Sequence, residues 1–179
     1  MRTFLKFTTV LFFAFLLNSC NMDKKDDTST TNDNEETLEA LIRQTNENRF
    51  KAWNTGDREL MVANLSDDFK RYTNGNLDID EKSAYPSVMD FYINAFPDLY
   101  FDYELVAVDG NKSFTQWTAS GRNTGPYKGQ PATDKQVVSQ GFTMVTYSED
   151  GKAMIEEAYV DNMGILNSLG YAMTPPSAQ

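Results

Sequence analysis

The sequence predicts an α+β domain in which helices come first and a mainly antiparallel sheet follows. Between residues 35 and 97 the apolar side chains recur every three to four residues, and after Pro97 they alternate along extended segments. Turn pairs such as Asp150-Gly151 separate the later segments and indicate β-hairpins. Helices followed by hairpin strands are typical of a helical layer packed on one face of a sheet.

The first helix is expected over residues 35–55. Its inward stripe has helical spacing: Leu38, Leu41, Ile42, Thr45, Arg49, Phe50 and Trp53. Gly56 is a suitable C-terminal stop, and Asp57 is a suitable N-cap for a second helix over residues 58–65.

A short strand and a third helix complete the first half of the domain. Residues 69–72 are expected to be extended and to end at the turn pair Asn74-Gly75. The third helix is expected to start near Pro86, because proline is favoured in a first helical turn, and to end before Pro97.

The second half is expected to hold four longer strands and a last helix, over residues 100–108, 113–123, 135–147, 153–161 and 163–169. In the 135–147 strand both alternating sets of side chains contain apolar residues. One face is therefore expected to line the interior. The other is expected to be covered by a second subunit, because a large apolar face is unusual on a monomer. These features predict a homodimer.

The N-terminal residues carry the signals of export. Residues 1–19 are expected to be a signal peptide, because a basic start precedes a short apolar run over residues 10–17. That run is too short to form a stable transmembrane helix. Residues 20–34 are rich in Asp, Thr and Asn and predict a disordered tether. Residues 35–172 then form the folded domain, and residues 173–179 a C-terminal tail.

The run Leu17-Asn18-Ser19-Cys20 resembles the lipobox of bacterial lipoproteins, in which cleavage before the cysteine exposes a residue that receives acyl chains. Cys20 is the only cysteine, so no intramolecular disulfide is expected. The resemblance implies a lipid anchor in a membrane of the cell envelope, with the protein in the outer membrane or facing the periplasm. The alternative is an ordinary signal peptide followed by a stray cysteine.

Charge and the absence of histidine restrict the chemistry. The net charge of −10 becomes −12 without the leader, which contains Arg2, Lys6 and no acid. An acidic chain argues against nucleic-acid binding, which depends on Lys and Arg. With no histidine, Ser-His-Asp and Cys-His systems are excluded, as are zinc sites built on His and Cys clusters. No metal or cofactor is expected, and acid–base chemistry falls to Asp, Glu, Tyr or Lys.

Short motifs occur in a fixed order along the domain. They are Trp53-Asn54-Thr55-Gly56-Asp57, Ala95-Phe96-Pro97-Asp98-Leu99, Val108-Asp109-Gly110, Gly121-Arg122-Asn123-Thr124-Gly125-Pro126, Gly129-Gln130-Pro131-Ala132-Thr133-Asp134-Lys135, Gly151-Lys152, Glu156, Asp161 and Leu169-Gly170. Together they resemble the SnoaL-like polyketide cyclase (ester cyclase) family over residues 35–170. The resemblance implies a cone-shaped barrel of the nuclear transport factor 2-like type, with a half-open apolar pocket for a small-molecule ligand.

The resemblance also assigns acid–base catalysis to Asp161, while two histidines of the family fall on Asn123 and Tyr72. If the strand face of Asp161 looks into the cone, poor solvation raises the pKa of its carboxyl and makes it a base. Alternatively, Asp161 caps the helix that follows. Asn123 either donates a hydrogen bond to a ligand carbonyl or holds a turn.

Further candidates come from the aromatic residues and from one acid. Pocket lining and core packing both remain open for Trp53, Trp117, Tyr72, Tyr92, Tyr127 and Tyr159. Glu157 is either an inward carboxylate paired with a base such as Lys135, or it faces solvent. Three functions follow: cyclase- or isomerase-like chemistry through Asp161, ligand binding without turnover, or a purely structural envelope lipoprotein.

Overall fold

The computed structural model describes residues 28–172. The expected signal peptide, Cys20, the first part of the tether and the 173–179 tail lie outside the described residues. No helix within residues 28–172 is both long enough and apolar enough to cross a membrane.

The described residues form an α+β domain, as predicted. In chain order its elements are α1 (Thr28–Thr55), α2 (Arg58–Ala63), β1 (Leu65–Thr73), β2 (Asn76–Ile79), the short 3-10 helix η1 (Lys82–Ala84), α3 (Tyr85–Ala95), β3 (Tyr100–Asp109), β4 (Lys112–Arg122), β5 (Gln136–Tyr147), β6 (Ala153–Val160) and α4 (Asn162–Leu169).

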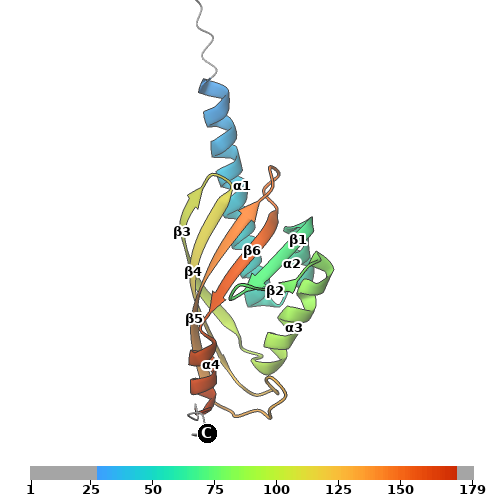
Figure 1. The fold of residues 1–179 in the computed structure, drawn as a ribbon, viewed down its shortest axis with the longest axis vertical. Coiled ribbons are helices and arrows are strands. Elements are labelled where there is room, and N and C mark those ends of the chain that lie inside the picture. The colour runs from blue at the N-terminus through green and yellow to red at the C-terminus, as the bar shows by residue number, and fades with distance from the viewer. Residues whose placement is uncertain (1–27, 173–179) are drawn as a thin grey trace, which may run out of the picture.

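The six strands form one curved sheet in the order β2-β1-β6-β5-β4-β3 (Figure 1). Successive strands β3, β4, β5 and β6 pair antiparallel, as the hairpin signals predict. β1 lies parallel to β6, its distant neighbour in sequence, so the sheet is mixed. The two edge strands, β2 and β3, do not pair with each other, and the barrel stays open.

Helix α1 begins at Thr28, seven residues before the expected start at residue 35. Residues 28–34, which we expected in the tether, are therefore helical. Once a helix is nucleated, each added residue gains one backbone hydrogen bond, so a polar segment can prolong a helix that packing has already fixed. The first turns of α1 extend past the end of the sheet (Figure 1).

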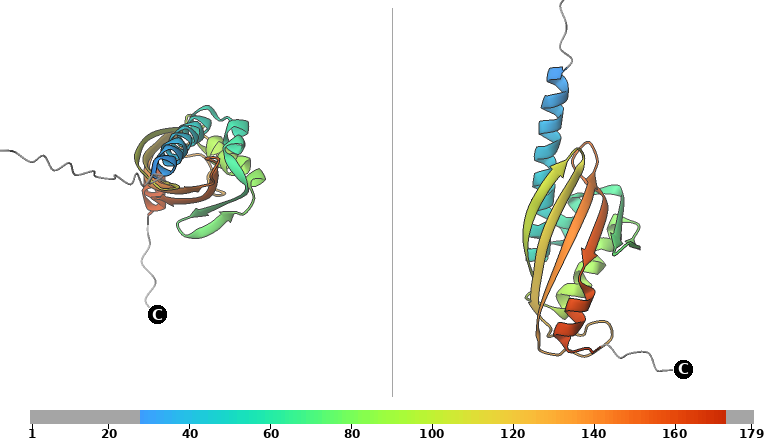
Figure 2. Two further views of the ribbon diagram at one scale, coloured as in Figure 1. Left: turned by 90° about the horizontal axis from the view of Figure 1, so that it is seen from above. Right: turned by 60° about the vertical axis from the view of Figure 1, so that its left-hand side comes forward.

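The main core lies between the helices and the concave side of the sheet, which curves around α1 and α3 (Figure 2). Its buried side chains come from α1, α2 and α3 and from strands β1, β2, β5 and β6: Ile42, Ala52, Trp53, Met61, Leu65, Phe69, Ile79, Tyr85, Met89, Val145, Tyr147 and Ala153. A second, smaller cluster joins Phe96, Tyr127, Val137, Ile165 and Leu169 near α4. The space between these two clusters is where the sheet encloses a cavity.

Candidate functional site

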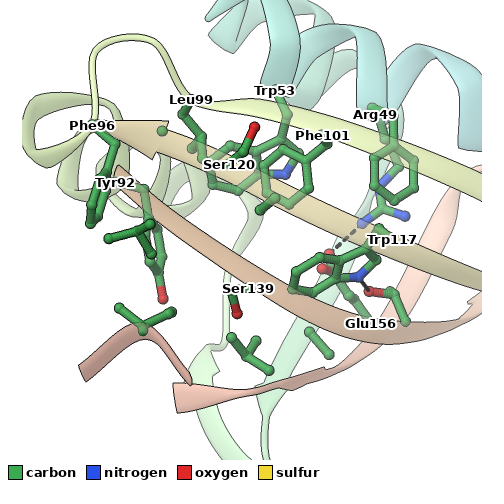
Figure 3. A pocket seen from close by; sticks show the side chains of 18 of the residues that line it. Arg49, Trp53, Tyr92, Phe96, Leu99, Phe101, Trp117, Ser120, Ser139 and Glu156 are labelled. Carbon is green, nitrogen blue, oxygen red and sulfur yellow. Dashed lines mark hydrogen bonds and ion pairs between the residues drawn. The ribbon is translucent and has the colours of Figure 1, made fainter. Parts of the chain in front are cut away.

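A cavity lies between helices α1 and α3 and the concave face of the sheet (Figure 3). Its volume is about 80 Å³, several times the roughly 10–15 Å³ that one water needs. Its lining is mostly apolar and comes from eight elements and the turn before β3: Arg49, Phe50, Trp53, Arg71, Tyr92, Phe96, Leu99, Phe101, Trp117, Ala119, Ser120, Gly121, Val137, Ser139, Thr143, Glu156, Ala158, Val160 and Ile165.

Aromatic rings form much of the wall. The Phe101 ring lies between two indoles, with centroids 5.4 Å from Trp53 and 5.3 Å from Trp117. The indole Nε1 of Trp117 donates a hydrogen bond of 2.9 Å to Thr143 Oγ1, which fixes the ring across β4 and β5. Gly141 leaves the room that this ring needs, since a Cβ there would lie 2.0 Å from Trp117 Cζ2.

One end of the cavity is ionic. Glu156 accepts hydrogen bonds from Arg49 Nη2, from Arg71 Nε at 3.1 Å and from the Tyr85 hydroxyl at 3.0 Å. The other edge of the Arg71 guanidinium donates to Asp78, outside the lining. Glu156 and both arginines are buried, so this is an interior cluster of charges rather than a surface ion pair.

The electrostatics keep every member of this cluster in its usual ionisation state. Burial raises the pKa of the Glu156 carboxyl, but Arg49 and Arg71 outweigh it and the net pKa is lowered. Burial likewise lowers the pKa of both guanidinium groups, and the negative Glu156 raises it beyond that loss. Burial, and then Glu156, raises the pKa of Tyr85 to about 12, so its hydroxyl remains a neutral donor near pH 7.

Local structure explains how these side chains meet. Arg49 lies on the buried stripe of α1, one turn before Trp53. Arg71 and Glu156 are register partners in the parallel β1–β6 pair. In β6, Glu156, Ala158 and Val160 line the cavity, which places the intervening residues on the outer face.

Sequence reasoning did not identify Arg49, Arg71 and Glu156 as members of the site. One signal was present, because Arg49 stands in a mostly apolar helical stripe and a buried arginine needs a partner. No comparable signal marked Arg71, whose partner is 85 residues away and was brought beside it by the parallel pairing. Glu157, the acid of β6 considered at the sequence level, is half-buried and outside the lining.

The structure places two of the predicted pocket residues, Trp53 and Trp117, in the lining, and Tyr92 joins them. Tyr72 and Tyr159 lie outside it: Tyr72 is half-buried on β1, and Tyr159 is 48% exposed on the outer face. Tyr127 is buried behind the wall, where its ring packs against Phe91, Tyr92 and Phe96.

Asp161 follows β6 and is exposed. Its carboxylate accepts a hydrogen bond of 2.8 Å from the backbone N–H of Gly164 and caps α4. It is not part of the cavity lining. Of the two arrangements that the sequence left open for this residue, the capping one is observed, and catalysis by Asp161 stays a prediction.

Asn123 is buried, but its side chain serves the loop after β4. Its Nδ2 donates to the carbonyls of Ala95 and Gly125, at 3.2 and 2.8 Å. Its Oδ1 accepts from the Thr133 N–H at 2.8 Å. Oδ1 also accepts from the Thr133 hydroxyl at 3.0 Å. These bonds occupy the whole amide within the loop, and Asn123 lies outside the cavity lining.

The arrangement suits binding of a small molecule more than proton transfer. The one carboxylate in the lining is Glu156, and two guanidinium groups hold it ionised, which makes it a weak base. Residues 28–172 contain no group of three or more acidic, His or Cys side chains arranged to hold a metal ion. Ser139 and Thr143 also lie in the lining, where the Ser139 hydroxyl donates to the Asp161 carbonyl and Thr143 Oγ1 accepts from Trp117 Nε1.

Comparison with known proteins agrees with this geometry. The family model described as SnoaL-like polyketide cyclase matches residues 43–169. No curated protein matches the sequence at a significant level.

Three solved structures are similar over most of their length. AclR from Streptomyces galilaeus, a proposed hydroxylase, is 20% identical, with a TM-score of 0.66 and coverage of 79% of this chain and 90% of that one. A proposed SnoaL-like polyketide cyclase from Jannaschia sp. CCS1 is 19% identical, with a TM-score of 0.67 and coverage of 76% and 94%. IdmH from Streptomyces antibioticus, a proposed polyketide cyclase, is 20% identical, with a TM-score of 0.64 and coverage of 73% and 99%. At identities this low, the similarity establishes the fold alone. It confirms the predicted nuclear transport factor 2-like architecture.

Proposed function

This chain belongs to the SnoaL-like polyketide cyclase family, and on that premise we propose that its cavity binds a small, largely apolar molecule that carries an oxygen-bearing group. The observation that carries the proposal is the cavity itself, with aromatic walls around Phe101 and a charged end at Arg49 and Glu156. Apolar walls with a few placed polar groups are typical of small-molecule sites. A purely structural role would instead favour a core filled by its own side chains.

Binding without turnover is the version we favour. Both family histidine positions hold other residues here, Asn123 and Tyr72, and neither lines the cavity. The lining acid, Glu156, is committed to Arg49 and Arg71. A site without an available base has the means to hold a ligand but lacks the usual means to move its protons.

Cyclase- or isomerase-like chemistry through Asp161 is the second candidate, and family membership supports it. In that reaction Asp161 removes a proton next to a carbonyl and returns it elsewhere on the molecule. Its carboxylate first has to release the N–H of Gly164 and turn inward. Loss of turnover in Asp161→Asn, with ligand binding kept, is the result that this candidate requires.

Tryptophan fluorescence tests the binding proposal directly, because the chain has two tryptophans and both line the cavity. Phenylbutanol and phenylbutyrate serve as probes, since a single benzene ring does not compete for tryptophan excitation. We expect saturable changes in emission with at least one of them. Ala119→Phe should weaken binding by filling the cavity, whereas Leu77→Ala, at an exposed site on β2, should not. No saturable change with either probe contradicts the proposal.

We also propose that the protein is a lipoprotein of the cell envelope, anchored at Cys20. Its support is the lipobox-like run 17–20 and the absence of any other cysteine. Several acyl chains on one cysteine anchor a protein durably, whereas a single chain binds a membrane only weakly. Cys20→Ala should lose membrane association, and mass spectrometry of the mature wild-type protein should find a modified N-terminus at Cys20. An unmodified N-terminus elsewhere would refute the anchor.

A homodimer is the third part of the proposal. It is supported by apolar side chains on the outer face of the sheet, including Val138, Phe142 and Tyr159. The helices of the domain cover the concave face and leave this one open (Figure 2).

A further inference from the structure

The charged side chains that line the cavity do not balance one another. Arg49, Arg71 and Glu156 are the ionised members of the lining, so two positive charges face one negative charge. Asp78 offsets part of the charge of Arg71, but it lies outside the lining and its side chain is 33% exposed to water. The interior therefore carries an excess of one positive charge next to an apolar space.

The excess is located at Arg49. Glu156 contacts both guanidinium groups and the Tyr85 hydroxyl, and Arg71 has Asp78 as a second carboxylate partner. Arg49 shares Glu156 with Arg71 and pairs with no second acid within residues 28–172. Its Nε–H is buried and has no acceptor among the described residues. A buried donor on a charged group without an acceptor is costly, and a ligand oxygen is one way to satisfy it.

The position of Arg49 relates this charge to the apolar wall. Arg49, Glu156 and Trp117 lie together at one end of the pocket, while Tyr92 and Phe96 lie at the other (Figure 3). The rings of Trp53 and Phe101 lie between the two ends. A bound molecule thus meets the guanidinium at one end and aromatic surfaces along the rest of its length.

We propose that the cavity selects a monoanion, a carboxylate or enolate borne on an apolar skeleton of about one ring, and that Arg49 pairs with its charge. This inference rests on the proposed ligand-binding function and specifies the class of ligand. The long-range field cannot produce such a preference, because the net charge of −10 repels anions. Preference for an anion over a neutral analogue of equal size is therefore a local property of the cavity.

The matched pair phenylbutyrate and phenylbutanol tests the inference on the full-length protein. Both are titrated against the emission of Trp53 and Trp117, and calorimetry gives the two dissociation constants. We expect phenylbutyrate to bind at least about tenfold more tightly, as for one charge-assisted hydrogen bond. Arg49→Gln should abolish the preference, so that the dissociation constants of the two probes for this variant lie within about twofold of each other. Arg58→Gln is the control, because Arg58 pairs with Asp90 at the surface and should keep the preference.

The outcomes separate this inference from the binding proposal. Equal binding of the two probes, or a preference that survives in Arg49→Gln, overturns the inference and leaves the binding function standing. If neither probe binds, the binding function fails and the inference fails with it. Should Arg49→Gln not fold, Arg49→Met keeps an apolar side chain of similar length in the wall and leaves Glu156 paired with Arg71. A preference retained in that variant also overturns the inference.

Discussion

Glu156 is the residue on which the ionic end of the cavity depends. It contacts Arg49, Arg71 and Tyr85, all of them buried. If its charge is removed, two guanidinium groups in the interior lose their shared partner. Buried ion pairs add little net stability compared with apolar residues, but breaking one from a single side is strongly destabilising.

We predict that Glu156→Gln lowers the free energy of unfolding at pH 7 by about 3–5 kcal/mol. The pH dependence gives a second readout. The folded pKa of Glu156 is lowered from 4.5, so its stabilisation is fully present above that value and is lost as the pH falls through the folded pKa. The difference in unfolding free energy between wild type and Glu156→Gln should therefore become smaller at acid pH. Denaturant unfolding at several pH values measures it, with Glu157→Gln as the neighbouring control. A gap that stays constant from neutral to acid pH would show that the charge of Glu156 does not stabilise the fold.

Asp161 differs from Glu156 because its observed partner is a backbone N–H at the start of α4. We predict that Asp161→Ala lowers the free energy of unfolding by about 1 kcal/mol, as for loss of an N-cap, and that Asp161→Asn costs less because asparagine also caps. Neither should change phenylbutanol binding. Asp57→Ala gives a matched comparison, since Asp57 caps α2 through Leu60 in the same way. Thermal unfolding, analysed with the heat-capacity change of unfolding included, measures the unfolding free energy that each variant loses. If either Asp161 variant binds phenylbutanol with a different affinity, Asp161 takes part in the ligand site and the prediction is wrong.

At this scale the sequence predicted residue types better than their partners. Trp53 and Trp117 were among six aromatic candidates for which pocket lining and core packing both stayed open, and the structure places them in the lining. The Arg49–Glu156 contact joins residues 107 apart in sequence and depends on how α1 crosses the sheet, which no local pattern encodes. Alternation along β6 defines two faces, but it does not say whether the face of Glu156 or that of Asp161 looks inward.

Among the elements, β5 shows how one small residue shapes the cavity. Gly141 is the register partner of Trp117 on β4, and the indole occupies the space where a Cβ would lie. The hydrogen bond from Trp117 Nε1 to Thr143 Oγ1 keeps the ring in that position. Glycine weakens a strand interior, so its presence in the middle of β5 indicates a close contact.

We predict that Gly141→Ala destabilises the domain by about 1–3 kcal/mol, the usual cost of overpacking. The added methyl group has to displace the Trp117 ring, which should alter the tryptophan emission and weaken phenylbutanol binding. Gln140→Ala is the control, because Gln140 is the exposed neighbour on the opposite face of β5. Unchanged stability and unchanged emission in Gly141→Ala would mean that the indole has room elsewhere.

Element boundaries were predicted best where a local signal marked them. The pairs Asn74-Gly75 and Asp150-Gly151 lie between β1 and β2 and between β5 and β6, as expected of turn residues. Strand β2 and the short helix η1 were not predicted. Both are four residues or fewer, too short for a periodic pattern to define them.

For the whole molecule, the sequence predicted the fold class and the family, but not the order of the sheet. The antiparallel pairs β3–β4, β4–β5 and β5–β6 follow from hairpins, which are local. The parallel pair β1–β6 joins the two halves of the chain and brings Arg71 to Glu156. The charged end of the cavity is thus a product of long-range topology, and its residues were the ones that sequence reasoning missed.

The outer face of the sheet leads to the last prediction, on the oligomeric state. Phe142 and Tyr159 are register partners on β5 and β6, and the rings of Phe142 and Phe114 lie 6.4 Å apart. Phe142 is 37% exposed, Tyr159 48% and Val138 53%, which leaves an apolar surface on antiparallel strands open to solvent. Two copies joined face to face would remove it from water, so we expect wild type to sediment as a dimer at tens of micromolar. Phe142→Asp should give a monomer with an intact fold, because it places a charge at the contact without disturbing the cavity side of β5. Leu77→Asp, at an equally exposed apolar site on β2, should remain dimeric. If the wild type sediments as a monomer at this concentration, the dimer prediction is wrong and the outer face is exposed in the free protein.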